Sequence, residues 1–566
     1  MALAAAESVY ADLRGLRDGL DVAAASGRTV LTDARPFATL VDVHNGLRTD
    51  VSRRLAGIDS VSLRPDDARA LGVMRRALGR DLDSLPPPST AAAKSALTRP
   101  DCAYDATTIA RLVNGLDSLR KRLYACYGWS QSHLILGRDT LDRLSILGAL
   151  GREDDAGRRR RLFLALEPVW RTVNGDNGSG SPYRQLIAHP IAQSGGSGLP
   201  PDSVEPWLLA ILTTWRRVNS DTLIEPWDWY HVTGRANRAL SPHVPRERLT
   251  ELNAGVYRTL GANVDSLHIR YDLDPREGKT PVAYTTFGAR PRFVNGRWRL
   301  GDPWVFATYR TGGLDNLNEL LHETGHAVHI AAIRTRPAFA DWPDSDPFTE
   351  ALADLIALDV YEPSWQQRWL GDSVPLADGL RGRYGGIVLD VAWAVFELRM
   401  TAHPKADPNA VWSELTRDYL RIRPHPELSW WAMRGQLIDA PGYMMNYAVG
   451  AIFSAAIRAR TRELHGATSA GDSTWYGWIA PRLFRYGLER PSREVIEEFL
   501  GGPVSPRALL EDMKRMAAPS SSSRAKRGIY SGLGEAMRFI SSSKARGDTG
   551  PPRKSSTTSR VGRSSP

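Results

Sequence analysis

The sequence predicts a mainly α-helical fold with one small β-sheet late in the chain. Through most of the 566 residues, apolar side chains recur at steps of three and four, as on the buried face of amphipathic helices. Residues 265–309 depart from this period, because β-branched and aromatic residues are concentrated there in short runs. An apolar fraction of 42% is enough for a large core, as one pair of lobes or as several domains.

Helical periodicity in the first half of the chain comes in three blocks, at about 7–80, 105–170 and 203–260. A stretch rich in Gly, Ser, Asn and Pro, from Asn174 to Pro201, separates the last two blocks and is expected to be a surface loop or a lobe junction. We therefore assign residues 1–264 to an N-terminal helical lobe. It is expected to be continuous, in one domain, with the region 265–516 that follows.

Three segments of this second region are predicted strands, at 268–273, 282–287 and 304–309. Between the second and the third, Asn295-Gly296 is a hairpin turn signal. An edge strand can hold an extended peptide through backbone hydrogen bonds, without regard to its side chains. A small sheet at this place is therefore a candidate peptide-binding element.

A His-Glu-x-x-His pattern follows the predicted sheet, at His322, Glu323 and His326. Apolar residues from 314 to 331 have helical spacing, which places the pattern on an amphipathic helix. Residues four apart share a helix face, so both imidazoles can bind one ion while Glu323 serves as its base. A catalytic zinc ion needs three protein ligands and a water, so one ligand is still missing.

The third ligand is predicted to be an acid on the next helix. A third His at the short spacing known from other zinc enzymes is excluded, because Ala332 stands there. The apolar run 348–358 contains only two acids, Glu350 and Asp354, and their spacing places them on one face. Because unpaired buried charge is costly, we predict that Glu350 binds the metal and that Asp354 accepts a ring N–H from a liganding His. The alternative is a helix whose acids face water.

The spacing of these four residues resembles that of the all-helical zinc peptidases, namely the angiotensin-converting enzyme family and the thimet oligopeptidase/oligoendopeptidase family. The similarity covers roughly residues 265–515, and it includes the segments 271–279, 303–308 and 441–447. It implies two helical lobes around a deep substrate cleft, with the small β-sheet beside the zinc helix. It also implies one Zn²⁺ per chain and oligopeptide substrates.

The resemblance further implies which residues contact the substrate. In these families the strand before the zinc helix lies alongside the peptide, so Ala307 and Thr308 are expected there. Tyrosines after the zinc core donate hydrogen bonds to the oxyanion, which implies that role for Tyr443 or Tyr447. The alternative is that both are core tyrosines.

Two family features have no clear counterpart in this chain. Both families place a His shortly before the Tyr, but no His occurs from 426 to 446, and His425 lies further back. The Lys that binds a substrate carboxylate in angiotensin-converting enzymes is also missing; Arg434 is the nearest cation, and Asn446 replaces a family Arg. Oligopeptidase and dipeptidyl carboxypeptidase action both stay open, and the alternative is a zinc-binding pseudoenzyme or peptide-binding module without turnover.

The net charge of +10 is concentrated at the C-terminus. Residues 517–566 hold ten basic and two acidic residues, which leaves a charge of about +2 for the rest of the chain. This tail is rich in Ser, Gly and Arg and is expected to be disordered. We expect no specific nucleic-acid partner, although weak polyanion binding by the tail remains a separate functional class.

The two cysteines, Cys102 and Cys126, leave the cellular compartment open. So few thiols suit a reducing compartment, and the absence of a recognisable signal peptide favours the cytoplasm. A Cys102–Cys126 disulfide would instead indicate a periplasmic or secreted protein. No apolar run approaches the length of a membrane span, so we expect no membrane contact. We also expect a monomer.

Overall fold

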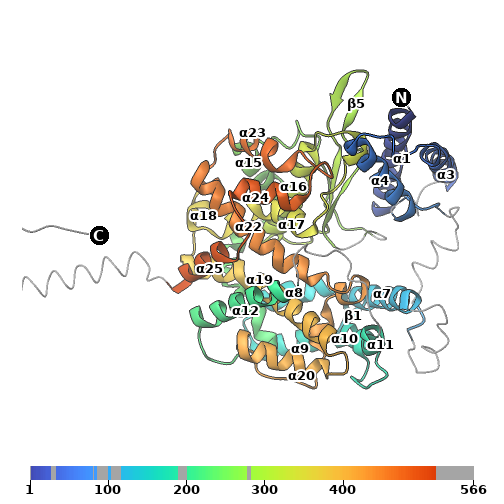
Figure 1. Ribbon diagram of the computed structural model, residues 1–566. Coiled ribbons are helices and arrows are strands. Elements are labelled where there is room, and N and C mark those ends of the chain that lie inside the picture. The colour runs from blue at the N-terminus through green and yellow to red at the C-terminus, as the bar shows by residue number, and fades with distance from the viewer. Residues whose placement is uncertain are drawn as a thin grey trace, which may run out of the picture. The chain divides into compact units, whose positions relative to one another are not determined.

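The computed structural model describes residues 2–26, 34–80, 82–85, 100–102, 116–188, 201–276, 279 and 282–517. Helices dominate and the strands are short, which confirms the predicted fold class (Figure 1). All of these residues belong to one compact unit, Met1–Ala517. The predicted tail lies outside the described residues, apart from Ala517.

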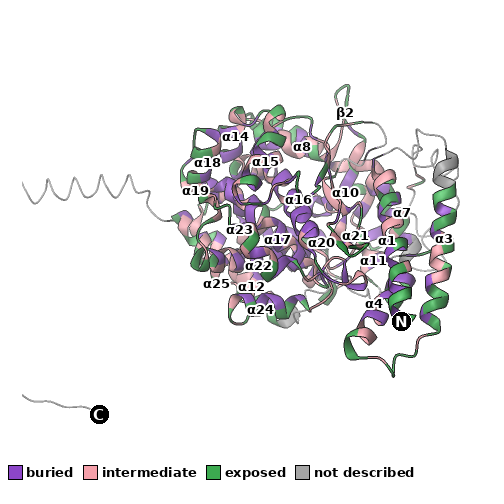
Figure 2. Ribbon diagram, turned by 90° about the horizontal axis from the view of Figure 1, so that it is seen from above, coloured by how far each residue is buried: buried purple, intermediate pink, exposed green. Residues whose placement is uncertain are grey.

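Three N-terminal helices form a small cluster of their own, comprising α1 (Ala2–Ala25), α3 (Ala34–Ala56) and α4 (Pro65–Arg80). Their apolar faces pack together and onto Phe339, and much of the outward face of α3 is exposed (Figure 2). The Arg336 guanidinium lies 2.8 Å from carboxylate oxygens of both Glu7 and Asp67. The cluster is thereby attached to the segment that follows the His-Glu-x-x-His helix.

The second block consists of short helices and one hairpin. Its elements are α7 (Leu116–Ser132), β1 (Leu134–Leu136), β2 (Asp139–Leu141), α8 (Arg143–Arg152), α9 (Ala156–Leu164), α10 (Glu167–Asn174), α11 (Pro182–Ile187), α12 (Pro201–Val218), α13 (Trp229–Thr233), α14 (Arg235–Leu240) and α15 (Leu249–Thr259). Cys102 and Cys126 form a disulfide, with their Cα atoms 5.8 Å apart, so the pairing left open by the sequence is present.

The predicted sheet has three strands in the order β3 (Arg270–Asp272), β7 (Pro303–Phe306) and β4 (Tyr284–Phe287). β7 pairs in parallel with β3 and antiparallel with β4. A separate hairpin joins β5 (Arg292–Val294) to β6 (Arg297–Arg299). Asn295 and Gly296 have φ values of 52° and 72° in its turn, so the hairpin signal is confirmed.

The strand before the motif helix, β7, is not an open edge of the sheet. β7 is the central strand, because it has a partner on each side. The Ala307 amide donates to the Asp272 carbonyl at 3.0 Å, and its own carbonyl accepts from Lys279 Nζ. Its backbone is therefore already used, whereas β4 has only one neighbouring strand in the described part of the chain.

The remaining chain is helical: α16 (Leu314–Ala332), α17 (Asp346–Ala357), α18 (Pro363–Leu370), α19 (Leu376–Ala402), α20 (Pro408–Leu415), α21 (Gln436–Asp439), α22 (Met444–Leu464), α23 (Trp475–Ile479), α24 (Ser492–Leu500) and α25 (Arg507–Lys514). α17 packs against both α16 and α22, and α19 packs against α22 and α12. One apolar core spans residues 123–516, so it runs across the boundary expected at 264. Among the described helices, none is both long and apolar enough to cross a membrane.

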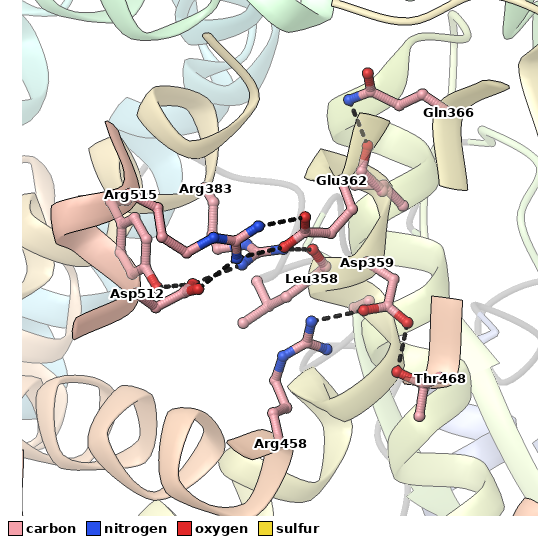
Figure 3. Close-up of polar contacts among 12 residues, drawn as sticks. Leu358, Asp359, Glu362, Gln366, Arg383, Arg458, Thr468, Asp512 and Arg515 are labelled. Carbon is pink, nitrogen blue, oxygen red and sulfur yellow. Dashed lines mark hydrogen bonds and ion pairs between the residues drawn. The ribbon is translucent and has the colours of Figure 1, made fainter. Parts of the chain in front are cut away.

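An ion-pair network fixes the end of this region onto α19 (Figure 3). Arg383 of α19 contacts Glu362 at 3.0 Å and Asp512 of α25 at 2.8 Å, and Arg515 joins the same two acids. Burial raises the pKa of Asp512, but the charge of Arg383 and the neighbouring donors hold it well below its usual value. In the same view, Arg458 of α22 binds Asp359, which follows α17. The helices that carry the candidate site are thus joined by charges as well as by apolar contacts.

Candidate metal centre and active site

Two glycines let three helices approach closely enough to share a site. A β-carbon on Gly325 of α16 would lie 2.6 Å from the Ala353 carbonyl oxygen of α17. A β-carbon on Gly450 of α22 would lie 3.2 Å from Glu350 Cβ, also on α17. Any larger residue at Gly325 would push α16 and α17 apart, so this glycine sets the distance between the predicted ligands.

The predicted metal ligands come together between α16 and α17. Nε2 of His322 lies 3.4 Å and Nε2 of His326 lies 3.8 Å from Glu350 Oε2. The ligand atoms that His322, His326 and Glu350 offer all lie within 4.8 Å of one another. Two imidazoles and one carboxylate facing a common point are the donor set of many catalytic zinc sites, so these residues fit the ion.

Asp354 lies one helical turn after Glu350 and contacts the other side of His322. Its Oδ1 is 2.8 Å from His322 Nδ1, which leaves Nε2 directed at the common point. Burial lowers the pKa of His322, but Asp354 and Glu350 outweigh burial and raise it well above its usual value. Burial and the neighbouring His322 lower the pKa of His326 well below the usual value, so this ring favours the neutral, metal-binding form.

Glu323 lies on α16 between the two histidines and is only 7% exposed. The Thr285 hydroxyl of β4 lies 2.7 Å from its Oε2 and 2.8 Å from its carbonyl oxygen, so it can donate to either. Burial raises the pKa of Glu323 to about 7. A carboxyl with a pKa near neutrality is suited to accept and return a proton.

Trp342 forms the wall of the site behind His326. Its ring centroid lies 5.6 Å from that of His326 and 5.2 Å from that of Phe287. His329 also packs on Trp342, and both of its ring nitrogens are buried without a hydrogen-bond partner in the described part of the chain. Burial lowers the pKa of His329 to about 3, so this ring is neutral at ordinary pH.

The two predicted tyrosines lie at the start of α22, on the side of Glu350. Their ring centroids are 5.4 Å apart and nearly perpendicular, at 72°. Burial raises the pKa of both Tyr443 and Tyr447, and the charge of Glu350 raises it further. Both hydroxyls are therefore protonated at neutral pH and can serve as hydrogen-bond donors.

His425 contacts two glutamates rather than the tyrosines. Its Nε2 lies 2.8 Å from Glu225 and its Nδ1 lies 2.6 Å from Glu427, so both nitrogens are in use. Gln436 instead contacts a tyrosine, since its Nε2 donates to the Tyr447 hydroxyl at 3.3 Å. This amide cannot be recognised in the sequence, because it belongs to no motif.

Arg434 and Asn446, the positions considered for a substrate carboxylate, are both occupied by internal contacts. Arg434 forms an ion pair with Asp390 and lies 4.6 Å from the centroid of Trp393. The Asn446 side chain is fully buried and donates to Asp346 at 3.2 Å. Both side chains thus already have a partner within the chain.

Two cavities lie beside the site. One, of about 710 Å³, is lined by Thr308, Tyr447 and Gln436, among others. The other, of about 1080 Å³, is lined by Thr286 and Trp342 on one side and by residues of α1 and α4 on the other. Volumes of this size accept several residues of a peptide.

Sequence reasoning missed Thr285, Trp342 and Gln436. Each belongs to a common residue type without a distinctive spacing, and each joins the site from a separate segment. Thr285 alone had an indirect signal, because its segment was already predicted to be a strand before the zinc helix.

Comparisons with known proteins show which solved structures have a similar fold. No protein-family model matches the chain, and no curated protein matches it in sequence. Solved structures with the same fold include an M32 carboxypeptidase from Deinococcus radiodurans R1, at a TM-score of 0.56 and 15% identity, covering 91% of this chain and 99% of that one. A protein named for oligoendopeptidase F gives a TM-score of 0.53 at 15% identity, covering 89% and 96%. Metallocarboxypeptidase 1 of Trypanosoma cruzi gives 0.51 at 13%, covering 92% and 99%. The chain therefore has the fold of the helical zinc metallopeptidases over nearly its whole described length.

Proposed function

We propose that this protein is a zinc metallopeptidase that hydrolyses peptide bonds in oligopeptides. The observation that carries the proposal is the convergence of His322, His326 and Glu350 within 4.8 Å, with Glu323 on the same helix as the two histidines. The likeness to solved peptidases supports it at the level of the fold. A zinc ion bound there would polarise the scissile carbonyl and make a water molecule nucleophilic near neutral pH.

The chain's own residues supply the proton transfers. Glu323 takes a proton from the attacking water and delivers it to the leaving amine, as its raised pKa allows. Thr285 holds the Glu323 carboxylate toward β4, and Asp354 holds the tautomer of His322. Each proton step thus uses a group whose position is fixed by a second segment.

Binding and charge stabilisation use the opposite side of the site. We assign the extended substrate to the edge of β4 that has no neighbouring strand among the described residues, beside Thr285 and Thr286, in place of Ala307. Thr308 lines the cavity of about 710 Å³. Tyr443 or Tyr447, both on the side of Glu350, would donate a hydrogen bond to the oxyanion that develops on the scissile carbonyl.

A peptide library tests the proposal and separates it from a pseudoenzyme or a peptide-binding module. The zinc-loaded protein is expected to cleave peptides, and a chelator is expected to abolish cleavage. Glu323→Gln should retain one zinc per chain while losing about 10²- to 10⁴-fold in kcat, the usual contribution of a general base. Product lengths identify exopeptidase or endopeptidase action, and full turnover by Glu323→Gln would refute the mechanism.

We also propose that the protein works in an oxidising compartment, because Cys102 and Cys126 are paired. The bond closes a 24-residue sequence separation, which constrains the unfolded chain by about 3 kcal/mol. Thiol labelling of the denatured protein purified from its natural source should find no free thiol. Two labelled thiols per chain would instead indicate a reducing compartment.

A further inference from the structure

One buried acid near the site has no part in the metal chemistry. Glu397 lies in α19 and is only 8% exposed. No ion pair in the described part of the chain includes its carboxylate, whereas the half-buried Asp390 of the same helix pairs with Arg434. Its surroundings are aromatic: burial and the charge of Glu397 raise the pKa of the nearby Tyr183, whose ring packs against Phe396 and Trp431. A lone carboxylate in such a place needs a specific compensation.

That compensation comes from the backbone on both sides of Tyr443. The Gly442 amide donates to Glu397 Oε1 at 2.8 Å, and the Met444 amide donates to Oε2 at 3.1 Å. Burial raises the pKa of Glu397, and the two amides oppose this change, because hydrogen bonds donated to both oxygens favour the ionised form. The carboxylate thus binds the chain one residue before and one residue after the tyrosine.

The start of α22 needs a hydrogen-bond acceptor from elsewhere in the chain, and Glu397 of α19 supplies it. Tyr443 is the N-cap residue of α22, and its side chain makes no capping hydrogen bond. Amides at the start of a helix have no partner within it, and an anion placed there also interacts favourably with the helix dipole. Gly442 has a φ of 89°, a conformation that favours glycine, and this turns its amide toward Glu397. Glu397 therefore provides the cap that Tyr443 itself does not provide.

We propose that Glu397 is a positioning residue for Tyr443: it fixes the turn at Gly442–Met444 so that the tyrosine hydroxyl stays aimed at the oxyanion. This inference rests on the proposed peptidase function, with Tyr443 as the oxyanion donor. The hydroxyl is useful only if it is already in place when charge develops, because preorganised donors cost no reorganisation during the reaction. The α19 helix, which carries no metal ligand, thereby contributes to the chemistry through two backbone amides.

The test combines Glu397→Gln with a matched control. Gln has nearly the same shape as Glu, but its NH₂ group replaces one acceptor oxygen. This group would face a backbone N–H, which is also a donor, so the turn should loosen. Because a misplacement of about 1 Å can cost up to about 100-fold, we expect kcat to fall about 10- to 100-fold with KM and zinc content unchanged. Asp407→Asn is the control, because Asp407 caps α20 by accepting from the Asn409 and Ala410 amides at 2.8 and 3.3 Å. That variant removes the charge of a capping acid elsewhere in the chain and should leave kcat unchanged.

A double-mutant cycle separates positioning from simple destabilisation. In a Tyr443→Phe background, Glu397→Gln should lower kcat by no more than about twofold further, because the group it positions is gone. An equal loss in both backgrounds would overturn the proposal. If Glu397→Gln does not fold, Glu397→Asp serves in the same cycle, since Asp keeps the charge on a side chain that is one methylene shorter.

Hydrogen exchange tests the contact without relying on turnover. The Gly442 and Met444 amides should exchange faster in Glu397→Gln than in the wild type, and Asp407→Asn should leave them unchanged. Unchanged exchange in Glu397→Gln would refute the contact itself. Faster exchange together with no peptide cleavage by the wild type would refute the proposed peptidase function and leave the contact standing.

Discussion

The candidate site has two sides that are built in different ways. The metal side uses two adjacent helices, and its residues lie within 33 positions of one another, from His322 to Asp354. The tyrosine side uses the turn into α22 and depends on distant segments, since Glu397 comes from α19 and Gln436 from α21. Charged contacts hold the metal side, whereas the tyrosine side relies on neutral hydroxyls and backbone amides.

The difference shows what kinds of contact leave a pattern in a sequence. Helix geometry alone brings His322 and His326 onto one face, and it does the same for Glu350 and Asp354. No such rule joins Gln436 to Tyr447 across an irregular turn. We therefore expect substitutions on the metal side to act on zinc content, and substitutions on the tyrosine side to act on kcat at full zinc content.

The largest effect is expected for Glu350→Gln. Loss of a carboxylate ligand removes one of three protein donors, so zinc should fall from one per chain toward none and activity should drop at least about 1000-fold. Metal analysis after dialysis, together with peptide turnover, measures both effects. An active variant with full zinc would show that Glu350 is not a ligand.

The next effect is expected for Tyr443→Phe and Tyr447→Phe, made separately. Removing one oxyanion donor typically costs about 10²- to 10³-fold in kcat, so whichever tyrosine holds this role should show that loss with zinc unchanged. The other tyrosine serves as the control, because it has the same size and similar burial. If neither variant loses kcat, the oxyanion donor lies elsewhere.

A smaller effect is expected for Asp354→Asn. Asn can still accept from the Nδ1–H of His322 but carries no charge, so the affinity for zinc should weaken about 10- to 100-fold, as for other partners of liganding histidines. Competition with a chelator of known affinity measures the change. At saturating zinc, kcat should recover most of its wild-type value, and a persistent loss would point to a direct catalytic role.

The smallest effect is expected for Gln436→Leu. A neutral hydrogen bond contributes about 0.5–1.5 kcal/mol, so losing the donor to Tyr447 should lower kcat about two- to tenfold. Gln436→Glu is the matched comparison, since it keeps the size but turns the donor into an acceptor. Equal kcat in wild type and both variants would remove Gln436 from the site.

Much of the helical framework could be predicted from apolar spacing, because α16 and α17 bury one face each and leave a regular pattern. The order of the strands could not be predicted. β7 follows β4 in the chain, yet it lies between β3 and β4, since pairing depends on which edges the loops bring together. The sequence therefore could not show that β4, with Thr285 and Thr286, is the strand with an unpaired side in the described part of the chain.

By itself, the sequence determined which side chains make up the candidate donor set, since two i,i+4 pairs on apolar helices restrict where four polar side chains can point. The tertiary structure alone decided how far apart those helices lie, through Gly325 against Ala353, and which strand faces Glu323. It also decided what holds the tyrosines. Every residue except proline has a backbone amide, so the hydrogen bond from Gly442 to Glu397 cannot be recognised in the sequence.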